Sequence, residues 1–257
     1  MTIGARMWPL RAGLVWTLVR TDFKARYHGT ISGFVWALLK PLAMFVVLMT
    51  VFSFIFQDPT YKLNLIVGLF LWDFFAEGTK TGLTSLLARS FLLTKARCPA
   101  WILVATSISN PLITLAVFNL VVVVFLIAGG RAPSIGAVAL FFAYSAALVA
   151  IVIGFSLAAS VLFLRYRDLN QVWEVVAQAG FFLAPIVYPL GIMPERFHFY
   201  FYLWPPTPII EFSRAVLVHG LVPTATAHLY LAIDAGLCLA LGFLIFRQFA
   251  PRAAEYL

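Results

Sequence analysis

Three ionisable side chains lie inside one long apolar stretch of the sequence. Asp73, Glu77 and Lys80 are separated by four and three residues, so a helix would carry all three on one face. If that helix crosses a membrane, charged groups that face lipid are costly, and the face should turn toward the bundle interior or a water-filled path. The face is therefore a candidate for lining or bracing a conduit. The alternative is a Glu77–Lys80 pair within the helix that serves packing alone.

A second polar stripe has the same helical spacing. Gln171, Glu174 and Gln178 lie three and four residues apart and lead toward Phe181 and Phe182. Polar groups crossed by aromatic rings suit a sugar chain, because the hydroxyls take hydrogen bonds while the C–H face of a pyranose lies on an apolar ring. Hydrogen bonding between neighbouring helices is the alternative explanation for this stripe.

The composition limits where such helices can exist. The chain has 257 residues, of which 63% are hydrophobic and 11% charged, and its mean hydropathy is +0.97. An ordinary soluble domain carries roughly 25% charged residues, so this chain should be embedded in a membrane. Its net charge of +8 fits a membrane surface better than nucleic acid, because the basic residues are scattered over loop ends and form no single face.

The elements follow from the lengths of the apolar runs, since a spanning helix needs about 20 mostly apolar residues. We predict one all-α transmembrane domain over 1–257, with an amphipathic interfacial helix at 6–27 and a six-helix bundle over 33–249. Several prolines interrupt segment 192–227, which predicts two short re-entrant helices at the outer face. The six predicted spans are 33–56, 63–86, 101–128, 136–164, 170–191 and 228–249.

Basic residues set the orientation. With the N-terminus inside, cytoplasmic segments hold twelve Lys and Arg residues against four in the outer segments, which predicts that both termini are cytoplasmic. No cleavable signal peptide is expected, because basic residues interrupt the N-terminal segment, and the first spanning helix should direct insertion.

Other kinds of chemistry find little support in the sequence. Cys98 and Cys238 have no metal-ligand spacing, and Gly78-Thr-Lys-Thr81 lacks the spacing of a phosphate-binding loop. A membrane-embedded glycan- or lipid-modifying enzyme is the main rival hypothesis, but the motifs of common hydrolase sites are absent from the sequence. An ATP-independent channel or scaffold is a weaker one.

Motifs along most of the chain resemble the permease subunits of type-2 ABC exporters that move cell-surface polysaccharides. In that family an Arg-Asp-x-Lys-x-Arg-Tyr stretch precedes a Gly-x-x-Trp and a Pro; here Thr21 replaces the residue usually beside the Asp. Four later stretches also match in order: 68–76, 163–168, 184–189 and 206–214, with Pro205 where Asn is common. The matching residues of the opening motif are Asp22, Lys24, Arg26, Tyr27, Gly33, Trp36 and Pro41.

The resemblance implies an assembly and an energy source. Two copies of the permease would form a conduit in the bacterial inner membrane, with two ATPase subunits docked beneath them. The chain itself would hold no cofactor or metal, and ATP with Mg²⁺ would bind to the ATPase. The basic, partly apolar connection between the second and third spans would be the coupling helix, with apolar contacts and a charged rim. Its residues are Arg89, Phe91, Leu92, Leu93, Lys95 and Arg97.

Two further groups of residues have possible roles at the membrane surfaces. Arg20, Lys24, Arg26 and Tyr27 could attract the pyrophosphate of a lipid-linked substrate at its entry, although anionic phospholipids explain the same charges. At the outer side, an interfacial aromatic belt is the default interpretation of the aromatic residues, and an outer gate or glycan-stacking ring is the sharper one. The gate candidates are Tyr188, Tyr200, Tyr202 and Trp204.

The resemblance also suggests the cargo. It points to export of a lipid-linked polysaccharide of the O-antigen type. Capsular polysaccharide and teichoic acid remain the alternatives that the sequence leaves open.

Overall fold

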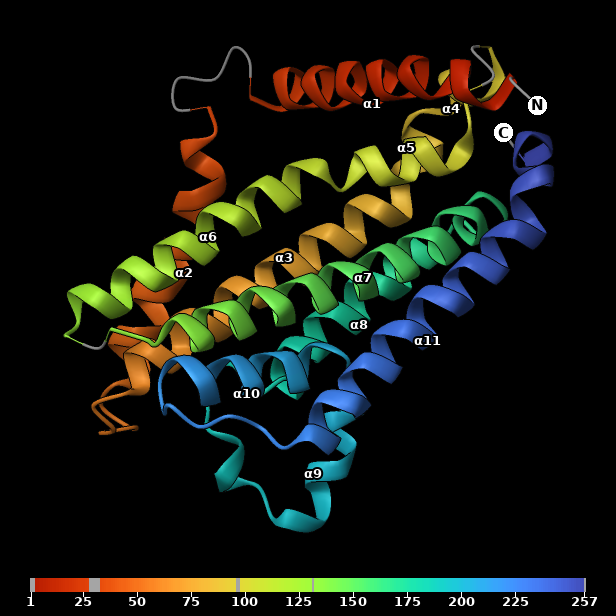
Figure 1. The fold of residues 1–257 in the computed structure, drawn as a ribbon. Coiled ribbons are helices and arrows are strands. Elements are labelled where there is room, and N and C mark those ends of the chain that lie inside the picture. The colour runs from red at the N-terminus through yellow and green to blue at the C-terminus, as the bar shows by residue number, and fades with distance from the viewer. Residues whose placement is uncertain (1–2, 28–32, 96–97, 131, 257) are drawn as a thin grey trace.

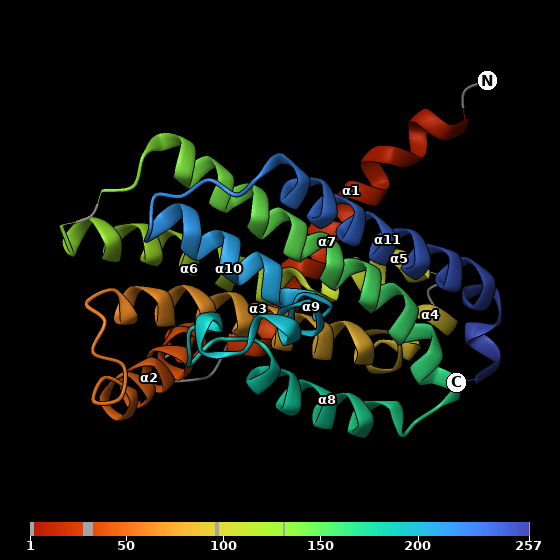
Figure 2. The same ribbon diagram turned by 90° about the horizontal axis from the view of Figure 1, so that it is seen from below.

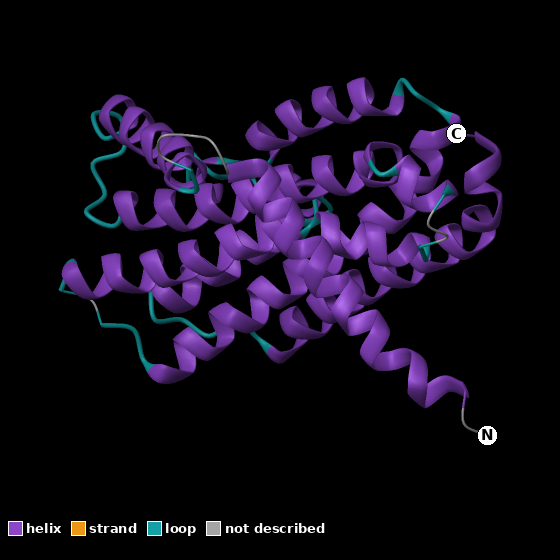
Figure 3. Cartoon of the chain, turned by 90° about the horizontal axis from the view of Figure 1, so that it is seen from above, coloured by secondary structure: helices purple, strands orange, loops and turns teal. Residues whose placement is uncertain are grey.

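A computed structural model describes residues 3–27, 33–95, 98–130 and 132–256. Across these residues the regular structure is entirely helical (Figure 3), which confirms the predicted all-α class. The elements are α1 (Ile3–Tyr27), α2 (Val35–Phe52), α3 (Tyr61–Ala88), α4 (Ser90–Thr94), α5 (Ala100–Ser107), α6 (Ser109–Ala128), α7 (Ile135–Arg165), α8 (Leu169–Leu183), the 3-10 turn η1 (Leu190–Ile192), α9 (Glu195–Tyr202), α10 (Pro206–Leu217), α11 (Ala225–Phe249) and the 3-10 helix η2 (Ala250–Tyr256).

Four described segments are long and apolar enough to cross a membrane: Val35–Phe52, Ala100–Ala128, Ile135–Arg165 and Ala225–Ala253. Helix α3 has 28 residues, a length of about 42 Å that suffices for a crossing, but it carries several charged groups. The chain is therefore a multi-pass membrane protein. That six segments cross the bilayer stays a prediction, as does the cytoplasmic location of both termini.

Helices α3 and α7 form the centre of the bundle. Helix α7 packs on α3 and α11, and the short helix α10 lies against both α3 and α7 (Figures 1 and 2). Rings fill the space between α3 and α6, where Phe70 stacks on Phe118 with ring centroids 4.1 Å apart. Both rings are fully buried. The packing between α3 and α6 at this point is thus apolar.

Small residues bring the backbones of α7 and α11 together. A Cβ atom at Gly154 would collide with the backbone of Cys238, and one at Gly242 would collide with the backbone of Gly154. Small residues favour such contacts in membranes, and the sequence predicts a close helix approach at Gly154, Ala158 and Ala159. The contact at Gly154 is confirmed.

The chain's two end segments lie at the same end of the bundle. Helix α1 runs across this end, where the C-terminal helix η2 is also found (Figure 1). One apolar cluster contains Val15 of α1, Leu92 of α4, Phe246 of α11 and Ala253 of η2. We call it the end cluster. The basic connections between α3 and α5 and between α7 and α8 begin at the same end.

The helix of the predicted fifth span ends earlier than expected. The sequence predicts a span over 170–191, whereas α8 stops at Leu183. Ala184 is extended, with ψ of 131°, because the residue before Pro185 is driven out of the helical region. The third span is also interrupted, at Ile108 between α5 and α6.

Segment 192–227 contains α9 and α10, as predicted for two short helices. Helix α10 is largely buried between α3 and α7. Whether the two helices dip into a leaflet stays a prediction.

Candidate functional site

The two polar stripes converge on one groove between α2, α3 and α8. A cavity of about 410 Å³ is lined by Asp73, Glu77 and Lys80 of α3 together with Glu174 and Gln178 of α8. The structure therefore brings together five of the eight predicted conduit residues. We call this region the polar groove; Figure 2 shows α3 and α8 side by side below α7.

Lys40 of α2 completes the groove. It lines the main cavity and also a neighbouring one of about 60 Å³, together with Asp73 and Glu77. Arg26 of α1 lines this smaller cavity. Four helices thus contribute charged side chains to one place.

Ion pairs across helices hold the groove together. The Lys80 ammonium lies 2.8 Å from a carboxylate oxygen of Glu174. Glu77 pairs with Arg26 of α1. Glu77 and Lys80 thus each bind a partner on another helix, and the packing-only pair within α3 is not what the structure contains.

Aromatic rings form the floor beneath α8. The Trp173 ring lies 4.1 Å from the ring of Phe155 on α7, and its Nε1–H donates a 3.1 Å hydrogen bond to Thr79 Oγ1. Phe181 contacts Trp72 at 5.9 Å between ring centroids. Rings therefore attach α8 to α3 and α7.

The other predicted residues of α8 point away from this floor. Gln171 is exposed, and 69% of Phe182 is exposed. These two side chains are available to a partner or a substrate rather than to the groove of the same chain.

Helix α1 is fixed to the bundle by a second ion pair. Arg89, at the C-terminal end of α3, pairs with Asp22 and also donates hydrogen bonds to Leu103 O at 2.7 Å and to Thr106 Oγ1 at 2.6 Å. Burial raises the pKa of Asp22 and lowers the pKa of Arg89. In each case the cost of leaving water exceeds the attraction of the partner, so this pair positions α1 more than it stabilises the fold.

The other basic residues of α1 differ in their surroundings. Arg20 and Lys24 are exposed, and both remain candidates for substrate entry. Burial acts to lower the pKa of Arg26, but the bond to Glu77 outweighs it and the pKa is raised. Tyr27 packs on Phe23, with ring centroids 4.8 Å apart.

The predicted coupling segment contains α4. Phe91 is 69% exposed, whereas Leu92 and Leu93 pack into the end cluster of the same chain. Lys95 is exposed. Arg97 lies outside the described residues. The apolar contact that a partner can reach is therefore Phe91.

The prediction that Arg89 belongs to the charged rim of this segment is wrong. Its guanidinium reaches the carbonyl of Leu103 on α5 and the Asp22 carboxylate, so it faces the inside of the chain. The reason is its position at the end of α3, directly under α1.

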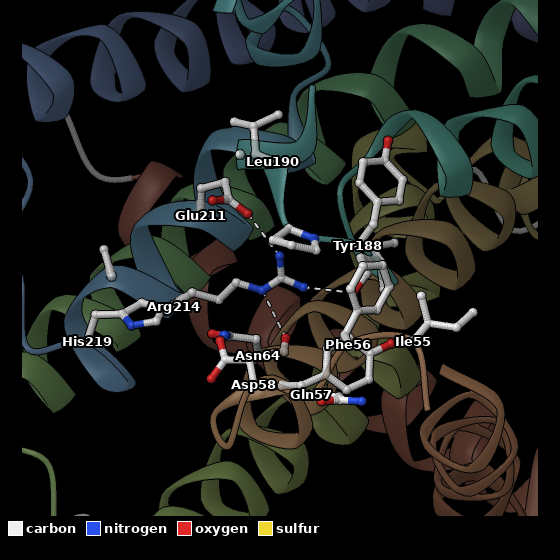
Figure 4. A pocket seen from close by; sticks show the side chains of 15 residues that line it. Ile55, Phe56, Gln57, Asp58, Asn64, Tyr188, Leu190, Glu211, Arg214 and His219 are labelled. Carbon is white, nitrogen blue, oxygen red and sulfur yellow. Dashed lines mark hydrogen bonds and ion pairs between the residues drawn. The ribbon is translucent and has the colours of Figure 1, made fainter. Parts of the chain in front are cut away.

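A further cavity lies around Arg214, at the end of the bundle opposite to the end cluster (Figure 4). Its volume is about 420 Å³, and its lining includes Asp58, Tyr188, Glu211 and His219. We call it the outer pocket. Arg214 is 5% exposed, and burial lowers its pKa.

The Arg214 guanidinium joins three segments. It donates hydrogen bonds to Asn64 O at 2.9 Å, Pro185 O at 2.5 Å and Ile186 O at 2.8 Å. It also pairs with Glu211 at 2.9 Å. Because α8 ends at Leu183, the buried carbonyls of Pro185 and Ile186 have no helical N–H partners, and Arg214 supplies the donors instead.

The outer aromatic residues fall into two groups. Tyr200 and Tyr202 are exposed, and the Tyr188 hydroxyl donates a 2.7 Å hydrogen bond to Phe182 O. Trp204 instead packs inside the bundle, where its ring lies 5.7 Å from Phe75. It fits there because Gly180 has no side chain to fill the space. The expected surface location of Trp204 is therefore wrong.

Three site residues have no role predicted from the sequence. Lys40 is an ionisable group within an apolar run, which is itself a signal of function. A similar signal comes from Arg214 and Glu211, which lie three residues apart in a mostly apolar segment. The sequence alone does not show what they contact.

Comparison with known proteins gives one family. The family model described as "ABC-2 type transporter" matches residues 13–218. An O-antigen export system permease protein, RfbA, from Klebsiella pneumoniae is 25% identical over 251 residues, which cover 95% of each chain. An RfbA permease from Myxococcus xanthus is 28% identical over 190 residues, covering 72% of this chain and 71% of that protein. The polysialic acid transport protein KpsM from Escherichia coli is 22% identical over 232 residues, covering 88% and 89%.

Proposed function

This chain belongs to the ABC-2 type transporter family, and we propose that it is the permease subunit of an ATP-driven exporter of lipid-linked O-antigen polysaccharide across the bacterial inner membrane. The names of the Klebsiella and Myxococcus relatives support this cargo. The polysialic acid transport protein among the relatives makes capsular polysaccharide the second candidate. Teichoic acid is a more distant third.

The polar groove carries the proposal. Ionisable and amide groups of α3 and α8 line one cavity together with the Trp173 ring, which packs on Phe155. Amides and carboxylates bind hydroxyl groups, and rings accept the apolar faces of sugars. A long polymer can slide along such a surface because each contact is weak.

The groove lies on one side of a single chain, so a closed passage needs a second copy. We infer a homodimer of the permease with two ATPase subunits, which bind ATP and Mg²⁺. Phe91 on α4 would insert into the ATPase. Movement of the ATPase would be transmitted from Phe91 through the end cluster to α1. The Asp22–Arg89 and Arg26–Glu77 pairs would then transmit it from α1 to α3.

Entry of the lipid-linked end would take place beside α1. The exposed Arg20 and Lys24 would attract the pyrophosphate that links lipid to glycan. Anionic phospholipids compete for the same charges, and binding measured with and without such lipids separates the two.

Reconstitution tests the function. The chain and its ATPase are placed in vesicles with lipid-linked polysaccharide in the outer leaflet, and ATP is added on the ATPase side. We expect polymer to enter the lumen, where externally added glycosidase cannot reach it. An ATPase variant that binds but does not hydrolyse ATP is the control. Full protection with that variant, or none with the active one, contradicts the proposal.

A further inference from the structure

The charges that line the polar groove balance. Three cations, Arg26, Lys40 and Lys80, meet the three carboxylates of Asp73, Glu77 and Glu174 across the two adjoining cavities. We infer that the polymer accommodated by this groove is an uncharged, hydroxyl-rich glycan, and that a polyanionic glycan is excluded. This inference rests on the proposed function, because it takes the groove as part of the transport path.

Each of these cations already has a carboxylate nearby. Lys80 is 2.8 Å from Glu174, and Arg26 is paired with Glu77. Lys40 lines the same two cavities as Asp73, whose carboxylate balances its charge in the sum over the groove. Among the described residues of the groove, the cations and carboxylates are therefore equal in number, and two of the three cations are held in ion pairs.

A polyanion that contacts Arg26 or Lys80 would therefore have to break an ion pair. Drawing Lys80 toward a sugar carboxylate or phosphate leaves Glu174 beside the same negative charge. Juxtaposed like charges repel each other and weaken binding. Hydroxyl groups can instead accept from the ammonium and donate to the carboxylate, so a neutral sugar bridges each pair without separating it.

The outer pocket also lacks an excess of positive charge among its described lining residues. Arg214 is the only Lys or Arg among its described lining residues. That guanidinium donates to three backbone carbonyls and to Glu211, so its charge is already engaged (Figure 4). Asp58 and Glu211 add two carboxylates to the lining. A polyanion that had passed the groove would meet net negative charge here.

The basic residues of the chain do not alter this selection. Arg20, Lys24 and Lys95 are exposed on α1 and at the end of α4, away from the residues that line the groove. They suit the phosphate of a lipid anchor or of membrane lipids. The lipid end of the cargo can thus be anionic while the glycan is neutral.

The experiment compares two polymers of equal length on one lipid anchor, a neutral polyhexose and polysialic acid. Both are offered to vesicles that contain the complete exporter, and the rate of ATP-dependent uptake is measured. We expect the neutral polymer to be moved faster by about tenfold or more. Equal rates, or faster uptake of polysialic acid, overturn the inference while leaving the proposed function intact.

Variants of one ion pair sharpen the test. Glu174→Gln frees Lys80 and gives the groove one positive charge, so uptake of polysialic acid should rise relative to the neutral polymer. Lys80→Gln should lower it, and the double variant should restore the wild-type ratio. A ratio that is the same in all four proteins contradicts the inference.

Binding decides the inference if the vesicles move neither polymer. The two glycans, cleaved from the lipid, are titrated into the purified exporter in detergent at low and high salt. Preferential binding of the polyhexose at both salt concentrations supports the inference. Preferential binding of polysialic acid that salt abolishes overturns it. The absence of any transport, by contrast, counts against the proposed function.

Discussion

The Lys80 ammonium of α3 lies 2.8 Å from the Glu174 carboxylate of α8, and this pair joins the two walls of the polar groove. Both side chains are about half exposed, so the pair adds little to stability and acts chiefly on the position of α8. In Glu174→Lys, two ammonium groups would face each other and push α8 away. We expect reduced transport by this variant, and recovery in Lys80→Glu/Glu174→Lys.

Vesicle uptake of the lipid-linked glycan measures this effect, with each variant's insertion checked first. A double variant that is as defective as the single one would show that the identity of each residue matters, not their attraction.

Replacement of Arg214 should destabilise the protein strongly. Arg214→Lys keeps the charge, but one ammonium cannot reach three carbonyls and Glu211 from a single position. We expect a loss of about 3–5 kcal/mol, the usual cost of leaving buried partners unpaired. Thermal unfolding in detergent measures it. The exposed Arg196, whose guanidinium lies over the Phe197 ring, serves as control, and Arg196→Lys should leave the melting temperature almost unchanged.

Two glycines of α11 form a matched pair for testing the α7–α11 contact. A methyl group at Gly242 would collide with the backbone of Gly154, whereas one at Gly236 would meet open space. We expect Gly242→Ala to lower stability by about 1–3 kcal/mol. Gly236→Ala should be neutral or stabilising, because alanine favours a helix by up to about 1 kcal/mol over glycine. Equal melting temperatures for the two variants would contradict the observed packing.

The coupling segment offers a separation of binding from folding. Phe91→Asp should abolish capture of the ATPase while leaving the chain's own stability unchanged, because the Phe91 ring is exposed. Leu92→Ala should lower stability by about 1 kcal/mol, since Leu92 packs partly into the end cluster. Co-purification and unfolding of both variants provide the readout. The hypothesis fails if Phe91→Asp still retains the ATPase.

Acidity should affect the fold through Asp22. Its pKa is raised above 3.8, chiefly by burial, so the folded protein holds this proton more tightly than the unfolded chain. The stabilisation from that proton is complete below pH 3.8 and is lost as the pH rises through the raised pKa. Asp22→Asn should remove this part of the pH dependence. Unfolding of both proteins from pH 3.5 to 7 measures the difference, and parallel curves would contradict it.

The helix positions were predictable where the signal was local. Apolar runs and prolines predicted the α-helical class and the two short helices of segment 192–227. The early end of α8 was missed because the preceding apolar residues masked the effect of Pro185, although the residue before a proline disfavours helix. Ile108 lies in a continuous apolar run, so the break between α5 and α6 had no compositional sign.

The site was predictable in its parts but not in its pairing. The spacing of Asp73, Glu77 and Lys80 predicted one polar face, and this face does line a cavity. Their partners, Arg26 and Glu174, come from distant positions in the chain, and only the tertiary arrangement brings them together. The proline-rich, aromatic sequence around Trp204 predicted a surface location. The space left by Gly180 on another helix could not be predicted from that local sequence.

The end cluster has a mechanical consequence. Val15, Leu92 and Ala253 belong to the first helix, the shortest α-helix described and the last 3-10 helix, yet they share one packed core. A load applied at Phe91 would therefore reach α1, η2 and the C-terminal part of α11 together, because Phe246 belongs to the same cluster.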